Sequence, residues 1–187
     1  MQNQARSTVV MVLMLAMLPL CAMADDTYYL SAGARISVFG NLAAGRDTSV
    51  GYNHSGEWGI ELRNISMDSA WYGSNTALSV AWLKGLGGDN IRWSAGAGMG
   101  DASSAAVDGQ AYILVIGRAE FSVFYLDIEN MVFRDGYMGD YYLGLNWYFI
   151  KSAVSAGINF YLGSMLGAGS GYIGVFPDAG LGIKAVF

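Results

Sequence analysis

The sequence contains few of the cysteine and histidine residues on which many exported enzymes and metalloproteins depend. Its 187 residues include one cysteine, Cys21, and one histidine, His54. Cys21 falls in a segment that we expect to be removed, which leaves the mature chain no disulfide, thiolate nucleophile or thiolate metal site. The sequence has no cluster of histidines and carboxylates, so a transition-metal site is not indicated either. We therefore expect no metal, no cofactor and a fold that holds together without disulfides.

Charge is also scarce. Charged residues make up 13% of the chain and hydrophobic residues 53%, whereas ordinary soluble domains are about 25% charged. The formal net charge of -5 provides no basic surface for nucleic acid, so we expect no nucleic-acid partner. This low charge and high hydrophobicity suggest that part of the protein surface does not face water.

No apolar run is long enough for a membrane-spanning helix. The run from Val9 to Leu20 follows a single charge, Arg6, and precedes the small-residue pattern Ala22-Met23-Ala24. It covers about a dozen residues, fewer than the roughly 20 that a spanning helix needs. We interpret residues 1–24 as a signal peptide cleaved after Ala24, followed by one domain over residues 25–187. An uncleaved anchor is disfavoured, and so is lipid attachment at Cys21, because Leu20 stands where the lipoprotein peptidase needs a small residue.

What the mature chain does contain is an alternation of apolar with small or polar residues, which has the period of β-strands. Even the charge-free stretch from Ser152 to Pro177 alternates and is rich in glycine, so it is no helix. Two stretches blur the pattern: residues 110–118 are apolar on both faces, and residues 121–130 can be read in either phase. The clearest alternation is found in residues 30–38, 58–63, 91–98, 141–149 and 153–162.

The breaks between these segments alternate between short and long. Short breaks are expected at residues 53–56, 85–89, 117–120 and 149–152, and longer loops at residues 39–45, 67–73, 100–109, 131–138 and 163–177. This spacing predicts an up-and-down meander of ten strands of roughly 8–12 residues, close to the length of a membrane-spanning strand. Eight strands is the alternative.

The amino-acid composition of the two faces of each predicted strand distinguishes a transmembrane β-barrel from a soluble β-sandwich. The second face is mostly glycine, serine, alanine and asparagine, which suits the inside of a closed barrel whose apolar face meets lipid. Aromatic residues also gather near the short breaks, as expected of an interfacial girdle: Trp58, Trp82, Trp93, Phe121, Trp147 and Phe149. A second band borders the longer loops: Phe39, Trp71, Tyr72, Phe133, Tyr137, Tyr141, Phe160 and Tyr172.

With its signal peptide, alternating strands and last segment "GLGIKAVF", the chain resembles the small bacterial outer-membrane β-barrels as a class, without matching one subfamily. The resemblance implies an all-β transmembrane up-and-down barrel in the outer membrane of a Gram-negative bacterium, in contact with outer-membrane lipids. It also implies that the barrel-assembly machinery reads the last strand, where Gly182, Ala185 and Phe187 match the class's assembly signal.

Three groups of residues are candidates for function. His54, with Ser55 and acidic neighbours, is a weak catalytic candidate, because a lipid A hydrolase needs a hydroxyl, an imidazole and a carboxylate together. Loop carboxylates Asp101 and Asp108 are most simply solvated. Inward-facing charges either line a narrow aqueous path or pair to plug the barrel: Arg35, Glu57, Glu61, Arg63, Arg92, Asp140 and Lys184.

The sequence therefore predicts a non-enzymatic outer-membrane barrel with a structural or narrow, porin-like passive-channel role. The alternatives are a lipid A or phospholipid-modifying enzyme centred on His54, and a barrel that acts through its loops. Solute, oligomeric state and the choice between an open and a plugged lumen stay open.

Overall fold

The computed structural model describes residues 26–39, 41–69, 73–87, 91–104, 109–151, 154–169 and 172–187. The predicted signal peptide with Ala24 and Cys21, and also Trp71, Tyr72 and Asp108, lie outside the described residues. Within them, no helix has the length and apolarity needed to cross a membrane.

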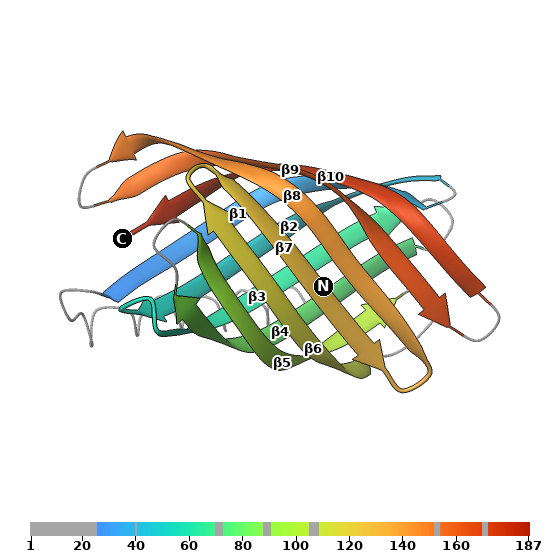
Figure 1. Cartoon of the computed structure of the whole chain (residues 1–187). Helices are drawn as coiled ribbons and strands as arrows, with labels where there is room; N and C mark the ends of the chain where they lie inside the picture. Colours follow the sequence, from blue (N-terminus) through green and yellow to red (C-terminus); the bar gives the residue numbers. More distant parts are fainter. Residues whose placement is uncertain are drawn as a thin grey trace.

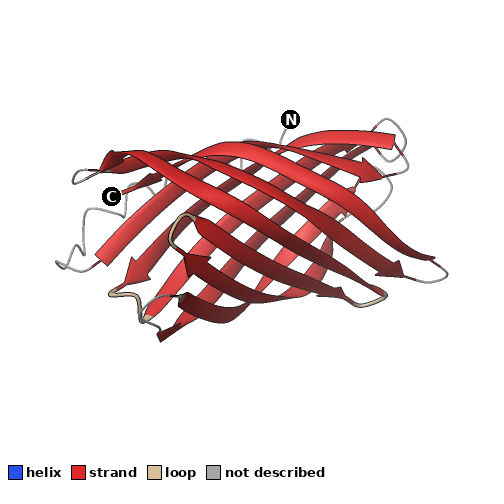
Figure 2. Ribbon diagram, turned by 45° about the horizontal axis from the view of Figure 1, so that its top comes forward, coloured by secondary structure: helices blue, strands red, loops and turns tan. Residues whose placement is uncertain are grey.

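Ten antiparallel strands form a closed barrel in which each strand pairs with its sequence neighbours and the last pairs with the first (Figures 1 and 2). This confirms the predicted fold class and the count of ten rather than eight strands. The strands are β1 (Asp26–Phe39), β2 (Asn41–His54), β3 (Trp58–Ser69), β4 (Gly73–Gly87), β5 (Arg92–Ser104), β6 (Gln110–Phe121), β7 (Phe124–Phe133), β8 (Gly136–Lys151), β9 (Ser155–Gly169) and β10 (Tyr172–Val186).

The two ends of the barrel carry different features. The termini end holds Asp26, Phe187 and the connections that follow β2, β4, β6 and β8, and the far end holds the connections that follow β1, β3, β5, β7 and β9. Most of the longer loops expected at the far end are wrong, whereas residues 105–108 of the loop expected at residues 100–109 lie outside the described residues. Residues 39–45 and 163–177, for example, are almost entirely strand. Their glycines and small polar residues fit a crowded barrel interior, so composition alone made strand look like loop.

The barrel has apolar side chains on its outside and charged side chains on its inside, which is the reverse of a soluble protein. Outward side chains such as Ile113, Leu143 and Ile183 are 61%, 58% and 66% exposed, whereas the inward Arg35 and Glu129 are 1% and 2% exposed. Successive residues of a strand point to opposite faces, so this division follows directly from the period-two pattern. An apolar outer wall around a charged interior is the arrangement expected of a barrel surrounded by lipid.

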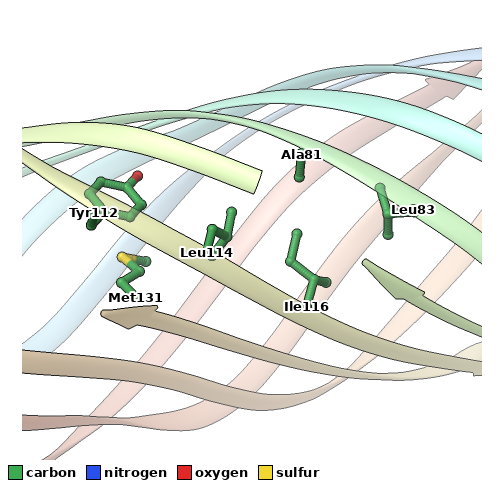
Figure 3. Packing of buried hydrophobic residues seen from close by; sticks show 6 residues of the cluster. All are labelled: Ala81, Leu83, Tyr112, Leu114, Ile116 and Met131. Atoms are coloured by element: carbon green, nitrogen blue, oxygen red, sulfur yellow. The ribbon is translucent and has the colours of Figure 1, made fainter. Parts of the chain in front are cut away.

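Part of the interior is apolar, and this explains the blurred stretch at residues 110–118. The inward side chains of Leu114 and Ile116 on β6 are each 2% exposed and pack with residues of β4 and β7 (Figure 3). The cluster consists of Ala81, Leu83, Tyr112, Leu114, Ile116 and Met131. It lies beside the β5 wall that carries Gly96, Gly98 and Gly100, where an added Cβ would meet mainly the backbone of β4 and, at Gly100, the Tyr112 ring of β6.

Inward tyrosines lie on glycines of the neighbouring strand. A Cβ added to Gly51 would fall 2.2 Å from the Tyr29 ring, and its strand partner across the β1–β2 ladder is Tyr29 itself. The same directly paired arrangement recurs three times around the wall: Tyr112 on Gly100, Tyr125 on Gly144 and Tyr161 on Gly180. These glycines let bulky rings lie flat against the wall of a narrow barrel.

The first and last strands close the barrel at a seam. The register runs from Tyr29 opposite Val186 to Ser37 opposite Asp178. At the termini end, Phe187 donates its backbone N–H to the carbonyl of Tyr28 at 2.8 Å, and the N–H of Tyr28 donates to the carbonyl of Phe187 at 3.2 Å. Phe187 thus continues the ladder beyond the end of β10.

Candidate functional site

The structure places most of the predicted lumen charges inside the barrel. Arg35, Glu61, Arg63 and Asp140 are buried, between 1% and 7% exposed, and Lys184 lies against the ring of Tyr29. Arg92 is exposed on its strand and lines the mouth of the lumen. Glu57 requires a correction: it is an exposed turn residue between β2 and β3 and not part of the lumen wall, because the strand ends at His54.

Arg118 on β6 is the centre of a network that crosses the lumen. Its Nη1 and Nη2 donate to the two carboxylate oxygens of Glu61 on β3, each at 2.7 Å. Its Nε donates to Asp127 on β7 at 2.8 Å, and Nη2 also reaches Glu129 at 3.3 Å. The bidentate contact with Glu61 joins strands that are not neighbours in the barrel wall.

Arg63 on β3 extends the network. Its Nε donates to both oxygens of Asp47 on β2 at 3.0 and 3.1 Å, and its Nη1 forms an ion pair with Glu129 on β7. The guanidinium carbon also lies 5.7 Å from the centre of the Tyr142 ring on β8. We call this set the lumen network: Tyr29, Asp47, Glu61, Arg63, Arg118, Asp127, Glu129 and Tyr142.

A second ion cluster lies deeper toward the far end. The Nη2 of Arg35 on β1 donates to both carboxylate oxygens of Asp140 on β8 at 2.6 Å and forms an ion pair with Asp178 on β10. The three side chains are completely or almost completely buried. Arg35 therefore ties together strands on both sides of the seam.

A cavity of about 900 Å³ occupies the lumen on the termini side of the lumen network. The turn residues Gly56 and Ser122 and the last residue of β4, Gly87, line its mouth, and Glu61, Arg118 and other network members line its inner part. The residues toward the far end, such as Arg35, Met131 and Met165, are buried and do not line it. We call this cavity the vestibule. The described residues that line it run from the turns of the termini end to the lumen network.

Sequence reasoning missed the two tyrosines of the lumen network and five charged members of these clusters: Asp47, Arg118, Asp127, Glu129 and Asp178. Arg118 was assigned to a turn, and Asp127 and Glu129 lie in the stretch whose phase was ambiguous. The inward positions of Arg63 and Glu61 were predicted, and a buried arginine needs carboxylates around it. That requirement was the available signal, but only the register shows which strands face each other across the lumen.

The predicted aromatic girdle lies mainly on the outer wall near the termini end. Trp82, Trp93, Phe121, Trp147 and Phe149 are between 48% and 70% exposed. Trp58 is partly buried, because it packs against the rings of Tyr52 and His54 at 5.4 Å. In the second band, Phe133 is misplaced: it faces inward and packs on Tyr112 at 5.2 Å.

The predicted assembly signal lies on both faces of β10 and of its continuation at Phe187. Gly182 faces the lumen and pairs with Gly33 across the seam, where a Cβ would fall within 2.7 Å of the neighbouring backbone. Ala185 pairs with Leu30 on the outer wall, and Phe187 is 52% exposed.

His54 lies on the outer wall at the termini end, not in the lumen. Its Nδ1 is 2.8 Å from Asp26 Oδ1 and 3.3 Å from the Tyr52 hydroxyl. Ser55 follows in the turn with a φ of 50°, and among the hydrogen bonds of the described residues none joins His54 to a serine. Asp101 is exposed on β5, and the described residues contain no group of three or more potential metal ligands.

No family model and no curated protein sequence matches the chain. Among solved structures, the chain is similar to Neisserial surface protein A, with 8% identity, a TM-score of 0.42 and coverage of 87% of this chain and 96% of the other. It is also similar to the N-terminal β-barrel domain of Pseudomonas aeruginosa OprF, with 13% identity, a TM-score of 0.38 and coverage of 87% and 98%. The second of these is itself a bacterial β-barrel domain. At these values the likeness concerns general fold and says nothing of ligands or partners.

Proposed function

We propose that the protein is a non-enzymatic barrel of the bacterial outer membrane with a structural role, and that its lumen is closed to solutes in the resting state. The exposed apolar outer wall and its aromatic residues support the membrane location. In this proposal the outer wall contacts outer-membrane lipids, and the barrel-assembly machinery engages β10 and Phe187.

The lumen network is the observation that carries the closed state. Arg118 reaches from β6 to Glu61 on β3, and Arg63 reaches from β3 to Glu129 on β7. These contacts run through the lumen, and buried side chains fill the space behind them. Breaking one partner of a buried ion pair leaves an uncompensated charge, so side chains of this network do not move aside easily. Passive conduction requires that they do.

Planar-bilayer recording tests the closed state. We expect no discrete conductance from the wild type and small, steady conductance steps from an Arg118→Ser, Glu61→Ser double variant, which removes the bidentate contact and shortens both side chains. Arg46→Ser is the matched control, because Arg46 is an exposed arginine on the outer wall. Steady conductance from the wild type would show an open passive channel and overturn the proposal.

The membrane location has a simpler test. The mature protein should sediment with outer membranes and should migrate differently on a denaturing gel before and after heating, because closed barrels resist the detergent until heated. A soluble monomer whose migration does not depend on heating would contradict the location.

An enzymatic alternative has one observation in its favour, the 2.8 Å contact that orients His54 on Asp26. A hydrolase also needs a nucleophile, and the hydrogen-bond partners of the His54 ring among the described residues are Asp26 and Tyr52. We propose that the contact pins β1 to β2 at the termini end. If overexpression changes the mass of lipid A or of phospholipids and His54→Ala abolishes that change, the non-enzymatic proposal is wrong.

A further inference from the structure

The apolar part of the outer wall is tall on one side of the barrel. Every outward side chain of β10 is apolar, and Phe187 continues the row at the termini end. The row extends over residues 173–187, which is about 35 Å along the barrel axis at about 3.3 Å per residue and a strand tilt of about 40°. The lipid-facing band of a membrane barrel is about 25 Å tall, so this side carries more apolar surface than such a band covers. The row consists of Ile173, Val175, Pro177, Ala179, Leu181, Ile183, Ala185 and Phe187.

The opposite side of the barrel has a much shorter apolar wall. In the closed ring of strands β5 lies across from β10, with β3 and β4 beside it (Figure 1). On β3 the outward residues are apolar over residues 58–62 and polar from Asn64 onward, and on β5 they are apolar over residues 93–99 and polar from Asp101 onward. The same rise and tilt give apolar heights of only about 10 Å on β3 and about 15 Å on β5.

Outward polar residues on the short side form one continuous row across four strands. Ser66 on β3 pairs with Arg46 on β2 and with Thr76 on β4, and Thr76 pairs with Ser103 on β5. We call these four residues the polar row. Arg46 and Thr76 are exposed, and the side chains of Arg46, Ser66 and Thr76 form no hydrogen bond or ion pair among the described residues. The polar row therefore has no protein partners in this part of the chain.

Outward polar groups on β7 and β8 are paired instead. The Tyr141 hydroxyl on β8 donates to Oδ1 of Asn130 on β7 at 2.9 Å, and the Tyr137 hydroxyl contacts both of them. A polar group that faces hydrocarbon without a partner is costly, so it has to be satisfied by protein or by water. Asn130 and the tyrosines satisfy one another, whereas the polar row can be satisfied only by water or lipid headgroups.

We propose that the barrel thins the membrane on one side, so that lipid headgroups and their water reach the polar row beside β3, β4 and β5 while the bilayer keeps its full thickness beside β10. A bilayer adapts to a short apolar wall by becoming locally thinner, because this keeps lipid chains away from polar side chains. The partner of this surface is therefore the headgroup layer of the membrane. The inference rests on the membrane location in the proposed function and extends it, since it gives the closed barrel an effect on the surrounding lipid.

Single-cysteine labelling tests the thinning, because residues 25–187 contain no cysteine. Residues 58–66 of β3 and residues 179–187 at the end of the chain span the same length, so Ser66 and Ala179 both lie about 20 Å along the axis from an aromatic residue of the termini end. Ser66→Cys and its matched control Ala179→Cys would be refolded into nanodiscs of dioleoylphosphatidylcholine, in which both membrane faces are accessible. The probe is a sulfonated, membrane-impermeant maleimide at pH 8.

The two sides should differ in labelling rate. Ser66→Cys and Thr76→Cys should react within about tenfold of Glu57→Cys, which lies in an exposed turn. Ala179→Cys should react at least about 100-fold more slowly than Glu57→Cys, because a thiol in hydrocarbon stays protonated and the charged reagent does not enter hydrocarbon. Thr76→Cys provides a second reading of the short side if Ser66→Cys fails to fold.

Three outcomes would overturn the inference. Labelling of Ser66→Cys and Thr76→Cys as slow as that of Ala179→Cys would show hydrocarbon of full thickness on both sides. Labelling of Ala179→Cys as fast as that of Ser66→Cys would show that the whole far end lies outside the membrane. Slow labelling of Ser66→Cys together with a disulfide-linked dimer under oxidation would show that a second copy covers the polar row. Heat-dependent migration reports on the membrane location separately, so a barrel that shows it and labels equally on both sides refutes the thinning alone.

Discussion

Removal of the Arg118 guanidinium should be one of the most damaging single changes in the barrel. Arg118→Met keeps the length of the side chain but removes its contacts with Glu61, Asp127 and Glu129, which are between 2% and 5% exposed. Leaving a buried charge without its partner costs about 3–5 kcal/mol. Tyr29 still donates to Glu61 and Arg63 still pairs with Glu129, so we expect a loss of about 3 kcal/mol, the lower end of that range.

Urea unfolding of the protein in lipid vesicles, followed by tryptophan fluorescence, measures this loss. The double variant Arg118→Met, Glu61→Gln should recover about 1–2 kcal/mol relative to the single variant, because it removes the carboxylate that the bidentate contact had served. Arg46→Met on the outer wall is the control and should change stability by less than about 0.5 kcal/mol. A loss below about 1 kcal/mol in Arg118→Met, or a double variant less stable than the single one, would refute the view that the network is a buried, mutually dependent unit.

Three further changes test other parts of the structure. Gly51→Ala should destabilise the barrel by about 1–3 kcal/mol in the same assay, because the new Cβ would displace the Tyr29 ring. The matched control is Gly117→Ala, which should be neutral or slightly stabilising because a Cβ there meets nothing within 4 Å. Equal effects of the two variants on stability would contradict the reasoning. Phe187→Asp should slow membrane assembly in cells while the refolded barrel stays closed and heat-sensitive; normal assembly would argue against a role of Phe187 in recognition. His54→Ala should lower stability by about 1 kcal/mol through loss of the Asp26 contact, and no change would show that the contact contributes nothing.

The fold was predictable because alternation is a local property of the chain. The outward placement of Ile183 and Leu143 follows from period two alone, and so does the inward placement of Arg35 and Arg63. Loop lengths were not predictable in the same way. Glycine signals a turn in most proteins, but Gly163, Gly167 and Gly169 are strand positions of β9, and a Cβ on Gly163 would fall 2.2 Å from the carbonyl oxygen of Tyr141 on β8.

The site was predictable only as a set of inward charges. That Arg118 faces Glu61 depends on the register of the strands between them and on the diameter of the closed barrel, and neither is written in any short segment. Glu57 shows that prediction from the sequence is least accurate at the end of a strand. There, a shift of the strand end by one residue decides whether a carboxylate lines the lumen or faces water.

The seam between β1 and β10 has a consequence for how the barrel forms. Every other strand pair can form as a local hairpin, whereas the seam brings together the two most distant strands of the described chain, and such non-local pairing is slow because the entropy of closing a large loop opposes it. Until it forms, β1 and β10 each expose an unpaired edge, and Arg35 stands apart from Asp178. The ion pair between these two residues spans the seam, so it contributes only after closure and acts as a latch. Closure is therefore the step at which assembly becomes hard to reverse. Weakening the ion pair between Arg35 and Asp178 should raise the rate at which the seam reopens before it lowers the rate at which the hairpins form.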